Sequence, residues 1–401
     1  MKNQLTYGLL CAALMVLSLP EQAFAQCNSD GLTPTGEPCN NVILTAVPFL
    51  RIPPNARSGA MGDVGMAISA DPNAMHYNAS NLVFAQKDVG IGLTYTPWLQ
   101  ALGVDDVYLA YATGYYKPDD RQAVGASLRY FSLGDIQFTN DQGEPLQLAR
   151  PREFEFKASY ARKLSENFSA AVGAKYIFSD LVGGTGNGVD IDAINTFAAD
   201  ISATYTAPFS NTEYDSRYSL ALAITNIGPK VRYGDAAEGD DFIPTNLGFG
   251  SSVRFGIDEY NAITLALDIN KLLVPTTQFE DNGTPIQNDE GAIAGIFSSF
   301  GDAPGGFGEE LREFNYSFGV EYWYDNQFAV RTGYYYEDQN KGNRRFLTAG
   351  IGLRYSQFGL DFSYLVPTTN QRNPLDNTLR FSLVFDLGAI APEDARMELG
   401  R

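Results

Sequence analysis

The sequence has no long hydrophobic run beyond its first 25 residues, and it is poor in basic residues and in histidine. No later stretch of the 401 residues approaches 18 apolar residues, which excludes a transmembrane helix. Lysine and arginine number 28 against 47 aspartate and glutamate residues, so the formal net charge is −19 at pH 7. This acidic balance argues against a nucleic-acid partner. A single histidine, His76, leaves little scope for a histidine-dependent catalytic or metal site.

The first residues have the pattern of a secretory signal peptide. Lys2 supplies a positive charge, a short apolar stretch follows, and Ala23-Phe24-Ala25 is a small-x-small cleavage site, so we expect residues 1–25 to be removed. A membrane anchor is the first alternative, but the apolar stretch is too short to span a bilayer. A lipoprotein attached at Cys27 is the second alternative, but Gln26 stands where lipid attachment requires a small residue.

Two cysteines follow the cleavage site, in a leader over residues 26–50 that is rich in Pro, Asn and Gly. In an oxidising compartment outside the cytoplasm we expect Cys27 and Cys39 to form a disulfide, which contributes about 3 kcal/mol in the chain-entropy model. A metal site would need more ligands than two cysteines, and no histidine lies near them, so none is expected.

The chain does contain a repeated alternation of apolar and polar side chains. About fourteen segments of 9–13 residues between Asp88 and Leu387 show it. Charged residues stay on the polar phase, as a barrel in lipid requires, because a charge facing lipid near the bilayer midplane costs about 2–4 kcal/mol. A soluble β-sandwich also alternates, but it would not give fourteen similar segments with aromatic-rich ends. We therefore predict an all-β fold, a transmembrane antiparallel β-barrel of about 14 strands over residues 88–387. The predicted strands are 88–96, 106–116, 122–132, 153–163, 167–179, 194–206, 217–227, 245–257, 260–270, 313–325, 327–337, 345–355, 358–366 and 378–387.

The connections between these segments alternate between long and short. If the chain starts on the periplasmic side, the odd-numbered connections are extracellular, and all but one of the even-numbered ones are very short, as periplasmic turns should be. This parity was not used to define the segments, so it supports both the strand count and the orientation. The long connections include 133–152, 180–193, 228–244, 271–312 and 367–377.

Two segments flank the predicted barrel. Residues 51–87 are rich in small residues, and glycines at 59, 62 and 65 permit tight turns and close backbone approach, so we predict a plug-like segment packed inside the wall. The alternative is a mobile periplasmic linker. Residues 388–401 form a short acidic tail that we expect to be loosely ordered.

Part of the plug-like segment resembles a known family. Residues Ala56–Asp63 and Asn73–Ala79, followed by the first strand, are similar to the N-terminal signature of the FadL-like outer-membrane barrels. Many of those proteins have Asn-Pro-Ala where this chain has Asn78-Ala79-Ser80, so the proline is missing. Within that superfamily the chain resembles the PorV (LptO) family of the type IX secretion system, over nearly all of the mature chain. The residues that carry this resemblance are Val47–Ala67, Tyr95–Leu99 and Leu267–Thr276.

The resemblance implies a 14-stranded barrel in the outer membrane of a Gram-negative bacterium of the Bacteroidetes. It also implies a docking or shuttle protein that binds the C-terminal signal domain of cargo at the translocon barrel SprA (Sov) and delivers it to an attachment complex containing the sortase PorU. The alternative is a FadL-like transporter of hydrophobic small molecules, which the many inward-facing charges make less attractive.

The connection 271–312 is the best candidate for a partner-binding surface, because a soluble loop rarely exposes so many apolar residues without a partner. The alternative is a loop folded inward as a lid with a small core of its own. Trp98 and Leu99 in the first long connection would extend the surface, or Trp98 would be a membrane-interface residue. The candidate residues are Trp98, Leu99, Leu272, Leu273, Val274, Ile293, Ile296, Phe297, Phe300 and Phe307.

No catalytic, cofactor-binding or metal-binding residue is predicted. His76 has no Ser-x-Gly turn or paired carboxylates around it, so we expect it to be packed or hydrogen-bonded. The acidic residues of connection 228–244 do not have the spacing of a calcium loop, so we expect them to be solvated.

Overall fold

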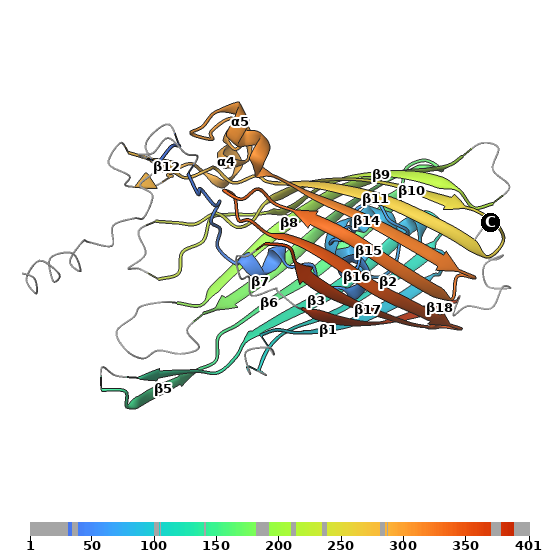
Figure 1. The fold of residues 1–401 in the computed structure, drawn as a ribbon, viewed down its shortest axis with the longest axis horizontal. Coiled ribbons are helices and arrows are strands. Elements are labelled where there is room, and N and C mark those ends of the chain that lie inside the picture. The colour runs from blue at the N-terminus through green and yellow to red at the C-terminus, as the bar shows by residue number, and fades with distance from the viewer. Residues whose placement is uncertain are drawn as a thin grey trace, which may run out of the picture.

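Fourteen antiparallel strands close into a barrel in which sequential strands are neighbours and the last pairs with the first (Figure 1). The computed structural model describes residues 31–33, 39–99, 104, 106–139, 142–181, 192–209, 214–234, 239–280, 285–286, 288–369 and 378–388. The predicted signal peptide and Cys27 lie outside the described residues, as does the tail beyond residue 388. None of the helices in these ranges has the length and apolar character that crossing a membrane requires.

The barrel strands are β1 (Val89–Pro97), β2 (Val107–Asp119), β3 (Gln122–Leu133), β6 (Arg152–Lys163), β7 (Phe168–Asp180), β8 (Ile194–Pro208), β9 (Arg217–Ile227), β10 (Asn246–Gly256), β11 (Asn261–Leu272), β14 (Phe314–Tyr324), β15 (Phe328–Tyr336), β16 (Arg345–Tyr355), β17 (Phe358–Pro367) and β18 (Leu379–Leu387). Each of the fourteen predicted segments overlaps one of them, so the predicted all-β barrel is confirmed.

Side chains alternate between lipid and lumen along each strand. In β14, Tyr316 and Phe318 are exposed on the outer face, whereas Ser317 and Glu321 are buried on the inner face. Charged residues on the polar phase of these strands lie on the inner face: Lys157, Lys175, Asp200, Asp268, Arg331 and Asp361 are buried and Arg254 is half-buried. A charged side chain loses its hydration in lipid, and this cost explains why the charged residues fall at the inward-facing positions of the alternating pattern.

Long and short connections lie at opposite ends of the barrel, which we call the long-loop end and the short-turn end (Figure 1). Two long connections contain small hairpins that the alternation did not predict. One is β4 (Ile136–Thr139) with β5 (Pro145–Ala149), and the other is β12 (Gln278–Phe279) with β13 (Pro285–Ile286). Strands this short give too few alternating positions to be recognised.

The chain before the barrel begins at the long-loop end, which corrects the periplasmic start that we assumed for the strand parity. The Asn41 amide donates to the Asn340 carbonyl (2.9 Å) in the connection between β15 and β16. The Ala46 amide donates to the Phe242 carbonyl (2.9 Å) in the connection between β9 and β10. After η1 (Pro48–Arg51) the chain passes through the lumen to reach β1 at the short-turn end. The strand parity is unaffected, because β1 still starts from the short-turn end.

Residues 52–87 occupy the lumen with short helices: α2 (Ala56–Gly59), α3 (Ala74–Tyr77) and η2 (Ala79–Phe84) (Figure 1). We call this segment the plug. Inward-facing side chains of the wall accept its backbone N–H groups: Ser382 accepts from Ala56 at 2.8 Å, and Thr348 accepts from Gly62 at 2.8 Å. A buried amide without such a partner would cost about 1–3 kcal/mol, so these bonds hold the plug against the wall.

The plug approaches the wall most closely at glycine. A Cβ on Gly333 of β15 would lie 2.1 Å from the carbonyl carbon of Met61, so only glycine fits there. Gly62 itself has φ +67°, a conformation in which a side chain would be strained.

Candidate functional site

The connection between β11 and β14 forms a helical cap over the long-loop end (Figure 1). It contains α4 (Ala292–Ser298), α5 (Phe307–Glu310) and η4 (Leu311–Glu313). Helix α4 packs on the protein through its small residues, because Gly295 and Ser299 are buried. A Cβ on Gly295 would lie 2.6 Å from the ring of Phe242. The larger side chains of the helix are therefore left on its outer side.

These outward side chains are apolar. Ile293 and Phe297 lie one turn apart on α4 and are 59% and 74% exposed. Phe300, in the turn that follows α4, is 51% exposed, and Phe307 at the start of α5 is 77% exposed. We call these four residues the cap patch. A helix in contact with water normally turns its apolar face inward, so this arrangement is the reverse of ordinary amphipathicity. Contiguous exposed apolar residues of this kind mark interaction sites.

Buried ion pairs hold the cap to the barrel. Glu313 accepts from the ammonium groups of Lys271 and Lys341, the latter at 3.0 Å, and from the Thr276 hydroxyl at 2.5 Å. Lys271 also pairs with Glu310 at 3.3 Å, and Lys341 with Glu309 at 2.6 Å. All five charged side chains of this cap ion cluster are buried: Lys271, Lys341, Glu309, Glu310 and Glu313.

The leader also contacts the cap. The side-chain amide of Asn41 donates to the Thr277 carbonyl at 3.1 Å and to Glu309 at 3.4 Å. Ile43 packs with Leu272 and Val274 in a small core beneath the cap. Leu44, the next residue, is 78% exposed and lies beside this core without contributing to it.

We expect a pH dependence at Asp302, in the turn that precedes α5. Burial raises the pKa of Asp302 to about 6, and Glu313 and Glu310 add to the effect, although the Thr276 amide donates to its carboxylate. A raised pKa means that the folded cap binds this proton more tightly than the free loop does. The resulting stabilisation is complete below the ordinary value of 3.8 and is lost as the pH rises through about 6.

Hydrogen exchange at the Thr276 amide measures this effect. After correction for the pH dependence of exchange at an unprotected amide, exchange at Thr276 should be slower at pH 5 than at pH 7.5. Asp302→Asn should remove this difference. Equal corrected rates at the two pH values in the unmodified protein would contradict the assignment.

Several residues of the predicted partner-binding surface are buried in the structure. The prediction that Trp98, Leu272, Leu273 and Val274 are exposed is wrong, because their exposed fractions are 7%, 6%, 2% and 2%. Trp98 packs edge-on against Phe131, at 5.1 Å between ring centroids. Leu99 and Ile296 are half-buried. The candidate surface therefore reduces to the cap patch.

The single histidine lies in the plug, whereas Cys39 lies beside the cap: its amide donates to the Gly31 carbonyl at 3.0 Å, and a Cβ on Gly31 would lie 3.0 Å from Glu309 of α5. Cys39 is disulfide-bonded, and its predicted partner Cys27 lies outside the described residues. His76 is on α3 in the plug, where its Nδ1 contacts the Arg129 guanidinium. That guanidinium also donates to the carbonyls of the leader, at 3.1 Å to both Phe49 and Leu50.

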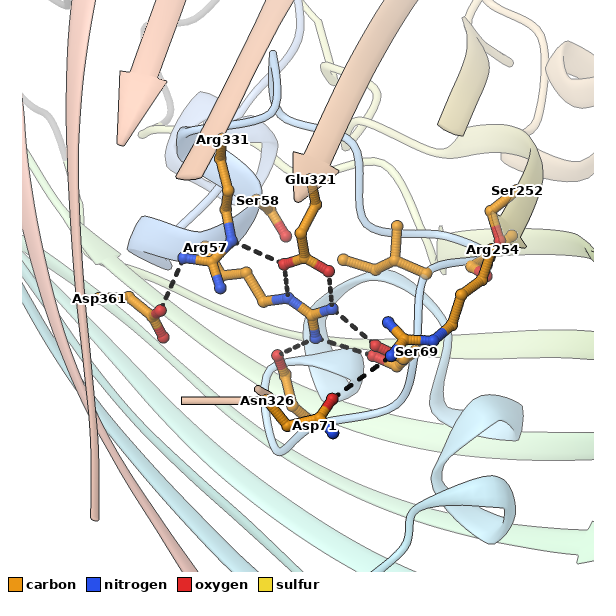
Figure 2. A network of polar contacts seen from close by, with 12 residues as sticks. Arg57, Ser58, Ser69, Asp71, Ser252, Arg254, Glu321, Asn326, Arg331 and Asp361 are labelled. Atoms are coloured by element: carbon orange, nitrogen blue, oxygen red, sulfur yellow. Dashed lines mark hydrogen bonds and ion pairs between the residues drawn. The ribbon is translucent and has the colours of Figure 1, made fainter. Parts of the chain in front are cut away.

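A network of charges joins the plug to the wall below the cap (Figure 2). Arg57 of α2 donates to both carboxylate oxygens of Glu321 in β14, at 2.9 and 2.8 Å, and to Asp71 at 2.9 Å. Glu321 also accepts from Arg331 (2.7 Å), which donates in turn to Asp361 (2.8 Å). Each charge of this chain is therefore matched by an opposite one at hydrogen-bonding distance.

A cavity of about 650 Å³ lies on the short-turn side of this network. Charged side chains such as Arg57, Asp71, Arg254 and Asp386 line it together with Trp323. Because polar and charged side chains make up much of its lining, this part of the lumen does not form a continuous apolar passage.

Several contributors to the site gave no signal in the sequence. Lys341 and Phe242 come from other connections, and Asn41 comes from the leader, so only the folded chain brings them to the cap. The spacing of Glu309, Glu310 and Glu313 was the one available hint. Acidic residues at these positions share a side of one short helical stretch.

Comparison with known proteins identifies a matching protein family and solved structures of similar fold. The family model described as "Type IX secretion system protein PorV" matches residues 36–279, which is more than half of the chain. None of the curated proteins compared matches the chain.

Solved structures of similar fold include a monoaromatic hydrocarbon channel and a toluene transporter. A deltaS2S3 mutant of TodX, a monoaromatic hydrocarbon channel of Pseudomonas putida, aligns with a TM-score of 0.50 at 12% identity, over 83% of this chain and 99% of that one. The toluene transporter TbuX of Ralstonia pickettii gives 0.47 at 13% identity, over 82% and 96%. A FadL homologue of Pseudomonas aeruginosa gives 0.45 at 12% identity, over 86% and 99%. At these identities a shared barrel fold is all that follows.

Proposed function

The chain belongs to the PorV family of type IX secretion system proteins, and we propose that within this system it is a docking and shuttle barrel. It is an outer-membrane β-barrel and a component of type IX secretion. In the proposed role it binds the C-terminal signal domain of cargo at the translocon barrel SprA (Sov). It then diffuses in the membrane and hands the cargo to the attachment complex that contains the sortase PorU.

The cap patch carries this proposal. Four large apolar side chains project outward from a short helical cap that buried ion pairs fix in place. A preorganised apolar surface loses little conformational entropy on binding, which suits a protein that must bind and release successive partners. Such a patch is expensive to expose to water, and a partner protein explains why it is exposed.

Transport of hydrophobic small molecules is the competing function. Two solved structures of similar fold are described as toluene or hydrocarbon transporters, which applies to those proteins. In this chain the plug and the charged network that includes Arg57 and Glu321 occupy the lumen. The residues of the cap patch are exposed, and none of them lines either of the two cavities in the barrel. Both features favour docking. We further propose that the chain has no catalytic activity.

Introduction of charge into the cap patch tests the docking proposal. In the full chain, Ile293→Asp and Phe297→Asp together should reduce secretion and surface attachment of cargo by at least about tenfold, since residues at the centre of an interface each contribute roughly 2 kcal/mol or more. Leu148→Asp is the matched control, because Leu148 is also an exposed apolar residue of a long connection, 45% exposed on β5.

Both variants should reach the membrane as folded barrels, which their unheated migration on SDS gels reports. Normal cargo secretion and attachment with the doubly substituted patch would remove the cap from the docking function. Deletion of residues 292–308 gives an independent version of the same test, because it removes the patch without adding charge.

A further inference from the structure

A second cavity of about 110 Å³ lies inside the barrel on the long-loop side of the plug. It lies between the plug and the inner faces of β9, β10, β11 and β14. One water molecule needs roughly 10–15 Å³ of such space, so this cavity admits a small molecule of several heavy atoms. Neither the docking function nor the cap patch involves it.

Asp268 of β11 lines this cavity, and one of its two carboxylate oxygens has no hydrogen-bond partner among the described residues. Its Oδ2 accepts the backbone N–H groups of Gly65 (2.7 Å) and Met66 (2.9 Å) in the plug. Its Oδ1 has no hydrogen-bond partner among the described residues, although the side chain is only 1% exposed. No described cationic group lies within ion-pairing distance of it. A buried carboxylate in this state requires a proton or a cation from the cavity.

Neutral hydrogen-bonding side chains line the same cavity as Asp268. The register of β11 and β14 places Ser317 opposite Asp268 and Asn315 opposite Asn270, all on the inner face. Asn270 already accepts from the side chain of Asn246 at 3.0 Å. The side chains of Asn315 and Ser317 make no hydrogen bond to the part of the chain that the structure describes. Oxygen atoms at several points around a carboxylate suit the three N–H bonds of an ammonium group.

The same cavity has an excess of positive charge elsewhere on its wall. Arg51 and Arg344 both line it, and they share one carboxylate, Glu337. Arg344 takes both oxygens of Glu337, at 2.8 and 2.9 Å, which leaves Arg51 a single contact at 3.5 Å. Burial and the neighbouring charge of Arg344 lower the pKa of Arg51, as expected for a guanidinium that lacks a full counter-charge.

We propose that this cavity binds a small zwitterion, a molecule with a primary ammonium group and a carboxylate or phosphate group. The ammonium group binds the Asp268 carboxylate with the help of Asn315 and Ser317, and the anionic group binds Arg51. A free amino acid and the phosphoethanolamine headgroup of a lipid both have this chemistry. Binding neutralises the two unbalanced charges, and because Asp268 lies on β11 and Arg51 is the last residue of η1, it ties the wall to the segment that leads into the plug.

Binding to the intact, folded barrel in detergent free of amine-containing lipids tests the proposal. The probes are glycine, β-alanine, γ-aminobutyrate and phosphoethanolamine. Their binding is measured by titration calorimetry or saturation-transfer NMR. At least one zwitterion should bind about tenfold more tightly than ethanolamine or acetate, each of which satisfies only one charge. A preference for phosphoethanolamine indicates a lipid headgroup, and a preference within the amino acid series indicates a free amino acid.

Substitutions of Asp268 and Arg51 distinguish binding at this site from non-specific binding. Asp268→Asn and Arg51→Gln should each weaken the best probe by at least about tenfold. Asp215→Asn is the control, because Asp215 pairs with exposed Arg217 at the short-turn end and should leave binding unchanged. If Asp268→Asn does not fold, Arg51→Gln and Asn315→Ala carry the test. The proposal is overturned if none of the four zwitterions binds, if single-charge fragments bind equally well, or if the variants that fold bind like the unmodified barrel.

Discussion

Glu321→Ala should release the plug from the wall. Glu321 is completely buried and accepts from two guanidinium groups, those of Arg57 and Arg331. Removing it leaves three guanidinium groups, those of Arg57, Arg331 and Arg354, with only two carboxylates, Asp71 and Asp361. Breaking a buried ion pair from one side costs about 3–5 kcal/mol, because the remaining charge is neither hydrated nor neutralised.

Hydrogen exchange over residues 56–71 and the temperature at which the folded barrel loses its characteristic gel migration measure the loss. Asp240→Ala is the matched control, because Asp240 and Arg232 form an ion pair at 2.7 Å with both side chains nearly half exposed. A pair of that kind contributes only about 0.2–1 kcal/mol. The double substitution Arg57→Met and Glu321→Met should recover part of the stability, since it removes the bidentate pair from both sides. An unchanged exchange pattern in Glu321→Ala would show that the network does not hold the plug.

Glu313→Ala should disorder the cap while leaving the barrel folded. Glu313 is the acceptor that Lys271 and Lys341 share, and both ammonium groups remain buried when it is removed. Glu309 and Glu310 each keep one of these lysines, so the local loss should stay within the range of about 3–5 kcal/mol for a broken buried pair. Partner binding should fall with the fraction of molecules whose cap is closed, although no residue of the cap patch has changed.

Two measurements on Glu313→Ala distinguish the effect of an ordered cap from the effect of the contacts that the cap patch makes. Exchange protection over residues 288–313 should drop, and recovery of cargo or translocon with the purified barrel should drop by at least about tenfold. Asp289→Ala removes an exposed acidic residue from the same connection and should do neither. Full partner recovery from a Glu313→Ala barrel with an unprotected cap would mean that docking needs no ordered cap.

Physical constraints explain why the barrel could be predicted from the sequence. Lipid forbids charge at positions such as Phe318 and tolerates it at Glu321, so the alternation fixes which side chains face outward. The same constraint fixes each strand to within a few residues. No such constraint acts on the connections, where burial is decided by whatever else folds onto them.

The errors at the candidate site follow from that difference. Leu272 and Val274 are buried because Ile43, more than 200 residues earlier, packs against them. That contact could not be foreseen while the leader was placed at the short-turn end. Phe297 is exposed because α4 packs through Gly295, a preference that depends on Phe242 in another connection.

The central claim is that this outer-membrane barrel is a docking protein and not a conduit. Purification of the intact barrel from its native membrane, with a photo-crosslinking residue at position 297 and in parallel at position 148, tests it most directly. The account predicts crosslinks from position 297 to a very large outer-membrane barrel or to proteins with C-terminal signal domains, and none from position 148. Absence of protein crosslinks from position 297, together with fatty acid or other apolar molecules recovered from the lumen, would contradict it.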